Sequence, residues 1–522
     1  MAAIARLLWQ VEADRPFTPA SATVPDNRWS ADFEGPEDFP EVAARYLSNQ
    51  GQPALLSEAW HQLLVGVNSD ARGWYPLEGR RRHRVACLEK ANALAEAVSR
   101  NALAAVARRL APVPALRDAT HHLLLCNLAP ASACRLTLPV TQSMKMLDAD
   151  GRTIPYETRA QAGLLFLDAR LALPPFGYSL VGLTPTADPR TPIWEPGTAV
   201  QNGQMAVSAL DNGLVIRRGE QELSLSLASF RLTDPLTGQC QEVSGALTRP
   251  VTRVSEKGIC PRLEMHGELA WGLESRLLAE VWPEEVTCEC EFDFHLPRQV
   301  GEGGWCPRGL LAMVKSVPGR VYYDVPCGAI RHPTEEASFF AAGRFAALCN
   351  DHGTAAIIPL TGEQCLFSNG RAGELGLCLG ASTEGAPRER PECTINGRGY
   401  AHHHMPALGD IFLRTYRHRF VIRLGQGDWR AINLPAVAWA HLEPLLPYET
   451  TPRDWQGDLP PTGSLLELRP SNVEILAVRT RGNRSQIVVN ETHGKDTRAF
   501  IRLGETAREV ALRPFGVASL EF

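Results

Sequence analysis

The sequence predicts a mainly β protein in which a helical N-terminal bundle precedes three antiparallel β-sandwich domains, the first small, the second large and the last small. Three observations support this fold class. Residues 55–110 carry apolar side chains at helical spacing, whereas from His121 onward the apolar runs are short, alternating and separated by turn residues. The chain of 522 residues is also too long for a single hydrophobic core.

The helical part comes first, in a region with the predicted boundaries 1–118. We expect a short helix at EVAARYL, and a second at 55–65, where Ala59 and Leu63 follow helical spacing. Residues 77–110 keep a 3.6-residue period without any proline, and Pro112 comes just after them. These segments predict a small bundle with one long helix or two collinear ones.

The β region divides at two proline-rich linkers, TPTADPRTPIWEPG (184–197) and ETTPRDWQGDLPPTG (449–463). We therefore predict a small sandwich over 119–187, a large sandwich over 193–447 and a C-terminal sandwich over 461–522. Asn212-Gly213 is a hairpin dipeptide near the start of the large sandwich. The alternation of apolar and polar residues in LSLSLASFRL is typical of half-buried antiparallel strands.

Composition and charge exclude several classes of partner. The formal net charge of −5 gives no basic footprint for nucleic acid or for an anionic membrane surface. No apolar run reaches the roughly 20 residues of a membrane helix. The thirteen cysteines are scattered without metal-ligand spacing, and Cys288 and Cys290 should point to one face of a strand. We predict reduced thiols and a cytoplasmic location, with no nucleic-acid or membrane partner.

The segment His61–Pro76 contains the most distinctive candidate site. A predicted helix ends there, and a turn places Asp70, Arg72 and Trp74 close together. A carboxylate and a guanidinium can hydrogen-bond vicinal hydroxyls of a sugar, and an indole offers an apolar face to its C–H groups. The alternative is purely structural: Asp70 caps the next helix, Arg72 pairs with it, and Trp74 plugs the bundle.

Other candidate residues lie in the large sandwich. Asp428 beside Trp429 would suit contact with a carbohydrate, but Trp429 could equally be a core anchor. A glycosidase needs two carboxyl groups about 5–9.5 Å apart, and the sequence does not show which acids converge. The acids considered are Asp324, Asp351, Asp410 and Asp428.

The histidines and the search for nucleophile motifs give no further candidate for a catalytic or metal site. His402, His403 and His404 resemble a metal motif, but no nearby Cys or His completes a ligand set, so a surface loop is favoured. His332 and His352 are expected to be hydrogen-bonded locally. There is no G-x-S-x-G, Walker A or H-E-x-x-H motif.

Six further segments of the β region form a recognisable series: CNLAPASACRLTLPV (126–140), PPFGYSLVGL (174–183), ALDNGLVIRRGEQELSLSLASFRLTDPLTGQC (209–240), VYYDVPCGAIRHP (321–333), FAALCNDHGTAAIIP (345–359) and GQGDWR (425–430). Taken in this order, they resemble the C-terminal half of glycoside hydrolase family 38, the α-mannosidases. The resemblance covers roughly residues 50 to 522. It implies that the large sandwich is a galactose-mutarotase-like supersandwich, and that members assemble as oligomers.

The departures from the family pattern concern its chemistry. The resemblance implies a zinc ion and an aspartate nucleophile, both supplied largely by an N-terminal catalytic domain, for which no matching segment is found here. One zinc ligand of the family is a histidine in a "HD" turn, and Ser69-Asp70 occupies that position. Serine is a poor zinc ligand, so this site is not expected to close around zinc even with a catalytic domain present, and Asp70 is the candidate metal ligand at this position. The "PH" of a later family element is Leu424-Gly425.

The function predicted from these features is mannoside or oligosaccharide processing, by the C-terminal part of an α-mannosidase-like glycoside hydrolase that is inactive without a catalytic domain. The expected partners are mannosides, a separate catalytic chain and further copies of the same chain. No cofactor is evident in the sequence, and zinc is implied only by the resemblance. Two alternatives remain open: a stand-alone carbohydrate-binding or scaffold protein, and a sandwich-type sugar lyase or epimerase.

Overall fold

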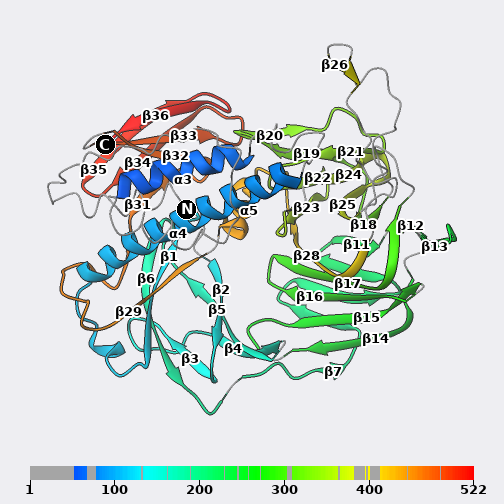
Figure 1. Ribbon diagram of the computed structural model, residues 1–522, viewed down its shortest axis with the longest axis horizontal. Helices are drawn as coiled ribbons and strands as arrows, with labels where there is room; N and C mark the ends of the chain where they lie inside the picture. The colour runs from blue at the N-terminus through cyan, green and yellow to red at the C-terminus, as the bar shows by residue number, and fades with distance from the viewer. Residues whose placement is uncertain are drawn as a thin grey trace.

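The computed structural model describes most of the chain from residue 52 onward, and two long helices precede a series of antiparallel sheets (Figure 1). The mainly β fold class predicted from the sequence is confirmed. The described residues are 52–67, 78–380, 394–395, 398–399 and 412–522, without residues 131–132, 162, 189, 228–229, 235, 244–245, 257, 271, 302–308, 363–364, 444 and 482–483.

Two helices open the described chain. Helix α3 (Gln52–Val67) and helix α4 (Glu78–Arg109) lie antiparallel, because Leu55 of the first packs near Val98 of the second. The C-terminal half of α4 turns its apolar face toward the first sandwich, where Leu110 and Trp455 share one cluster. Among the described residues, no helix is both long and apolar enough to cross a lipid bilayer.

The small sandwich consists of a sheet in the order β29-β1-β6-β3, with β30 beside β6, and a second sheet in the order β2-β5-β4. Its core lies between the sheets and includes Leu125, Met146 and Leu167. The strands β29 and β30 come from the chain after the large sandwich. The bounds are β1 His121–Asn127, β2 Ala133–Val140, β3 Met144–Leu147, β4 Tyr156–Gln161, β5 Leu164–Ala172, β6 Gly177–Pro185, β29 Leu446–Thr450 and β30 Thr462–Ser464.

The large sandwich has an eight-stranded sheet in the order β21-β24-β25-β18-β11-β10-β9-β8 and a twelve-stranded sheet. The latter has the order β20-β19-β22-β23-β28-β17-β16-β15-β14-β7, with β12 paired to β17 and β13 paired to β12. The bounds are β7 Glu195–Pro196, β8 Ala199–Asn202, β9 Met205–Leu210, β10 Gly213–Arg218, β11 Gln221–Leu227, β12 Phe230–Thr233, β13 Cys240–Val243, β14 Thr248–Ser255, β15 Arg262–Ala270, β16 Leu273–Val281, β17 Glu285–Val300, β18 Leu310–Lys315, β19 Arg320–Val325, β20 Gly328–Arg331, β21 Ser338–Ala341, β22 Ala346–Asn350, β23 Gly353–Pro359, β24 Cys365–Asn369, β25 Glu374–Gly380 and β28 Phe412–Gly425. A separate two-stranded hairpin joins β26 Thr394–Ile395 and β27 Arg398–Gly399.

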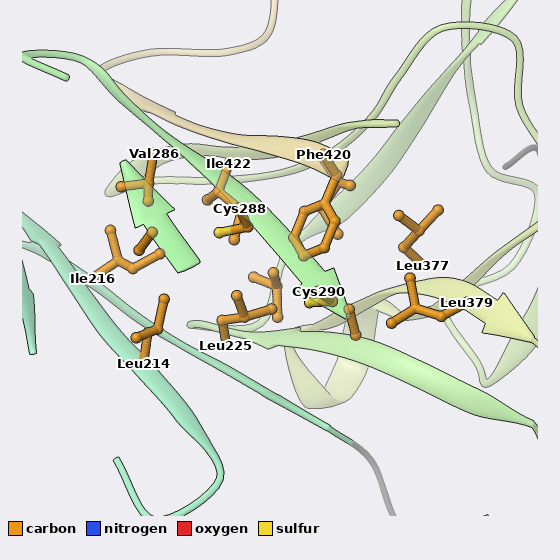
Figure 2. Close-up of a cluster of buried hydrophobic side chains, with 14 of the residues drawn as sticks. Leu214, Ile216, Leu225, Val286, Cys288, Cys290, Leu377, Leu379, Phe420 and Ile422 are labelled. Atoms are coloured by element: carbon orange, nitrogen blue, oxygen red, sulfur yellow. The ribbon is translucent and has the colours of Figure 1, made fainter. Parts of the chain in front are cut away.

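The core of the large sandwich lies between these two sheets. Figure 2 shows Leu214 and Leu225 of one sheet facing Cys288, Cys290 and Phe420 of the other. Both cysteines are buried, so they share one face of β17, as the sequence predicted. Burial of this apolar surface is the main stabilising contribution to the domain.

The C-terminal sandwich packs the sheet β31-β34-β35 against the sheet β32-β33-β36, around a core that includes Ile487 and Ile501. Helix α5 (Leu434–Leu442) lies between the large sandwich and this domain, since its Trp439 contacts the C-terminal core while Leu434 packs under the twelve-stranded sheet. The bounds are β31 Leu466–Arg469, β32 Val473–Arg481, β33 Arg484–Glu491, β34 Thr497–Leu503, β35 Thr506–Leu512 and β36 Val517–Glu521.

Candidate functional site

The turn with the strongest carbohydrate signature lies outside the described residues. Ser69, Asp70, Arg72 and Trp74 fall in the gap of 68–77 between α3 and α4, so the structure places only their flanks. The triple histidine at 402–404 and Asp410 likewise lie outside the described part of the chain.

The last turns of α3 form one flank of that gap. Glu58 is held toward α4 by an ion pair with Lys90 at 2.7 Å and accepts a hydrogen bond from Gln62 at 2.9 Å. Partial burial raises the pKa of Glu58, but the interactions with Lys90 and Gln62 lower it by more, so the net shift of the pKa is downward. The opposite face of α3 presents exposed Trp60 and Leu64 to solvent.

Asp428 begins the turn that follows β28 and is committed to that turn. Its Oδ1 accepts hydrogen bonds from the backbone N–H of Arg430 at 3.0 Å and of Ala431 at 3.1 Å. Its Oδ2 accepts from Arg430 Nη1 at 3.0 Å. Burial raises the pKa of Asp428, but these hydrogen bonds lower it more. The carboxylate is thus ionised and serves as a turn cap.

Trp429 is a core residue with 0 % of its surface exposed. Its ring lies 5.7 Å from the ring of His493 and 6.4 Å from that of Phe345, and the Arg430 guanidinium lies 4.3 Å from its centroid. The indole has no free face for a sugar in this conformation. The interpretation of Trp429 as a core anchor, left open by the sequence, accounts for its contacts.

The turn at residues 427–430 (sequence GDWR) joins the large sandwich to the C-terminal sandwich. Arg430 Nε donates to the backbone oxygen of His493 at 2.6 Å, and His493 Nε2 lies 3.0 Å from Asn433 Oδ1. On the C-terminal side, the buried Glu491 carboxylate accepts from the backbone N–H groups of four residues and from Asn472 Nδ2 at 2.7 Å. These contacts give the turn a positioning role between two domains.

One of the acids nominated from the sequence, Asp324, converges with a second acid that was not nominated. Arg344 lies between Asp324, at 2.9 Å, and Glu474 of the C-terminal sandwich, also at 2.9 Å. Burial raises the pKa of Glu474, only partly offset by Arg344. Both carboxylates are buried, so this arrangement ties the two domains together rather than facing a substrate. No sequence signal could have found Glu474, because it is 130 residues from Arg344.

The remaining candidates occupy ordinary positions. Asp351 lies in the exposed turn between β22 and β23. His332 is hydrogen-bonded locally as predicted: its Nδ1 lies 2.8 Å from the backbone oxygen of Thr334, and its Nε2 lies 3.3 Å from Ser338 Oγ.

The described residues offer no fit to a zinc ion. Among them, no group of three or more His, Cys, Asp or Glu side chains is arranged to hold a metal.

The comparisons with known proteins support the fold. Neither a protein-family model nor a curated protein matches the sequence. Two solved structures from Enterococcus faecalis are similar over 92 % of this chain, each with a TM-score of 0.64: an α-mannosidase from strain V583 at 13 % identity, and a protein in glycosyl hydrolase family 38 at 12 % identity. The chain spans 64 % of the first and 68 % of the second.

Proposed function

We propose that this chain takes part in mannoside or oligosaccharide processing, as the helical and sandwich part of an α-mannosidase-like glycoside hydrolase. The observation that carries the proposal is the structural similarity to two such proteins over 92 % of the chain. The succession of helices, small sandwich, large sandwich and C-terminal sandwich agrees with the resemblance noted in the sequence.

In this proposal the described residues support the site and do not perform hydrolysis. Asp324, which the sequence nominated, and Glu474 are buried around the guanidinium of Arg344 and cannot receive a glycosidic oxygen. The nucleophile and the metal would come from a catalytic domain, in the same polypeptide or in a partner chain. Asp70 and Arg72 would hydrogen-bond the hydroxyl groups of the sugar, and Trp74 would pack against its ring.

The proposal is tested by measuring sugar binding and hydrolysis with the same purified chain. We expect mannose to bind in a calorimetric titration without turnover of an aryl α-mannoside. Replacement of Asp70 or Trp74 by alanine should weaken binding about tenfold or more, which is ~1.4 kcal/mol or more. Asp150→Ala, an exposed hairpin acid, is the matched control and should bind as the unmodified chain does.

Other outcomes would favour the alternatives. Mannose binding that is unaffected by Asp70→Ala and Trp74→Ala would remove the turn from the sugar site. Hydrolysis by the chain alone that survives Asp70→Ala and is lost in Asp428→Ala would replace the proposal with a sandwich enzyme. Binding that persists while no catalytic partner restores hydrolysis would favour a stand-alone binding protein. Light scattering of the chain, alone and mixed with a catalytic domain, tests the proposed oligomer and partner.

A further inference from the structure

Two cysteines face each other across neighbouring strands of the eight-stranded sheet. Strands β24 and β25 pair antiparallel, and the last pair of their ladder is Leu366 with Leu377. The next residue of each strand is a cysteine, and the side chains of Cys365 and Cys378 are joined by a hydrogen bond. Leu366 and Leu377 both enter the core of the large sandwich. Because side chains alternate between faces of a strand, the two cysteines lie together on the outer face.

The spacing of such a pair suits a disulfide. Residues directly opposite in an antiparallel ladder have Cα atoms about 4.5–5.5 Å apart. A disulfide needs a Cα separation of about 4.4–6.8 Å, so the backbone does not have to move far. Cys365 is exposed and Cys378 is half-buried, so a reagent in solvent can reach the first of the two sulfurs.

The electrostatics of the pair assign different roles to the two thiols. A hydrogen bond from Cys378 lowers the pKa of Cys365 to about 7, although partial burial acts the other way. Donating that bond, together with burial, raises the pKa of Cys378. A thiol whose pKa lies near the ambient pH is the best attacking group in thiol–disulfide exchange. Because Cys365 is also the more exposed of the two, it is the attacking thiol and Cys378 the resolving one.

We propose that Cys365 and Cys378 form a reversible cross-strand disulfide by exchange with low-molecular-weight disulfides of the glutathione type. The Cys365 thiolate attacks one sulfur of the oxidised reagent, the reagent's S–S bond breaks, and the released thiolate takes up a proton. Cys378 then gives its proton to solvent, attacks the Cys365 sulfur and displaces the second thiol. Two protein thiols are oxidised, and one reagent disulfide is reduced to two thiols.

The displacement step is favoured by the change in charge at Cys365. Once this sulfur is in a mixed disulfide it carries no charge and no longer accepts the hydrogen bond that holds the proton on Cys378. The product joins β24 to β25 covalently within the large sandwich. The state of the pair thus follows the ratio of oxidised to reduced small thiol around the protein.

The chain itself offers a matched control. Cys240 is also exposed, and hydrogen bonds with Thr233 and Arg231 lower its pKa. It is a reactive thiol without a cysteine opposite, because its partner in the ladder is Thr233. Cys240 should therefore stop at the mixed disulfide, whereas Cys365 should proceed to the internal one.

The test is incubation of the reduced full-length chain with oxidised glutathione, followed by mass spectrometry of the intact protein and of its peptides. We expect peptides linked through Cys365 and Cys378, and one glutathione on Cys240. Cys378→Ser should leave glutathione on Cys365, and Cys240→Ser should keep the linked peptides. Cys378→Ala should move the pH dependence of Cys365 modification to higher pH, because the hydrogen-bond donor is gone. Stable glutathione on Cys365 of the unmodified chain, or no modification of Cys365, would overturn the proposal.

Discussion

The junction between the small and the large sandwich rests on a buried ion pair whose removal should be costly. Glu157 of β4 is fully buried, and Arg262 of β15 is nearly so. The guanidinium of Arg262 binds both carboxylate oxygens of Glu157, with Nη1 to Oε2 at 2.8 Å. The backbone N–H of Ile259 donates to the same oxygen at 3.1 Å. Because both side chains are buried, these hydrogen bonds replace the water contacts that the charged groups would otherwise make.

The pair belongs to an alternating series of charges. Arg262 Nε donates to Glu280 at 3.2 Å, and Glu280 also accepts from Arg135 at 3.0 Å. Arg135 lies 3.8 Å from Asp168, which accepts from Arg159 at 3.0 Å. Burial raises the pKa of Glu280, but the two arginines lower it more. Three guanidiniums are thus balanced by three carboxylates.

The change Glu157→Ala leaves Arg262 buried with one partner in place of two. Breaking a buried ion pair costs about 3–5 kcal/mol. Because Glu280 still contacts Arg262, we expect the lower end of this range, about 3 kcal/mol, which is roughly a hundredfold in the equilibrium constant for separating the junction. The combined change Glu157→Gln with Arg262→Met removes both charges and should cost less than Glu157→Ala alone.

The assay is equilibrium unfolding in urea, followed by the fluorescence of Trp282. This tryptophan reports on the same junction, because the guanidinium of Arg170, on β5, lies 4.9 Å from its ring. Since the chain has eleven tryptophans, the Trp282→Phe variant supplies the background to subtract. A chain of several domains need not unfold in two states, so the comparison uses the transition that Trp282 reports. A Glu157→Ala variant within about 0.5 kcal/mol of the unmodified chain, or a double variant less stable than the single one, would refute the reasoning.

Three further predictions concern the junction with the C-terminal sandwich. Trp429→Ala should destabilise the protein by about 3–5 kcal/mol in urea, because it empties a buried site between two domains. Glu491→Ala should cost about 3 kcal/mol or more by leaving buried N–H groups without an acceptor. Burial raises the pKa of Glu491 but its hydrogen bonds lower it more, so its contribution is full above the ordinary value of 4.5 and is lost as the pH falls through the lower folded value. Melting temperatures measured between pH 3 and 7 (roughly the range of carboxyl titration) should therefore fall less steeply with acid in Glu491→Ala than in the unmodified chain. The pH dependence expected for Glu474 is the reverse of that for Glu491. Burial raises the pKa of Glu474, so its contribution to the stability of the fold is present at low pH and is lost as the pH rises through the folded pKa. Glu474→Gln should therefore leave the melting temperature at neutral pH unchanged or raise it, and a clear loss would contradict this account.

The sequence predicted the succession of elements well because hydrophobic periodicity is a local property. The helix expected over 55–65 is the central part of α3, and the period over 77–110 marks α4. The prediction for Cys288 and Cys290 holds for the same reason, since alternation alone decides which residues share a face of a strand. The strand β29 pairs with β1, more than three hundred residues earlier in the chain. No local pattern specifies such a pairing.

The candidate site was less accessible to sequence reasoning. The motif Asp428-Trp429 fits a carbohydrate contact, in which the acid and the indole both face the sugar, but an indole at this position can also serve as a core anchor. The choice depends on His493 and Phe345, which are distant in sequence and enclose the ring. The pairs of Arg344 with Glu474, and of Cys365 with Cys378, likewise exist only after the strands have taken their register.

The sequence by itself determined which stretches form helices and strands, the order of these elements, and which face of many of them points inward. These properties follow from the spacing of apolar residues over a few helical turns or strand positions. The tertiary structure alone decided which polar groups meet and which aromatic rings are covered. Glu157 and Arg262 are 105 residues apart, and what a charge or a ring can do depends on its neighbours in space and on its access to water.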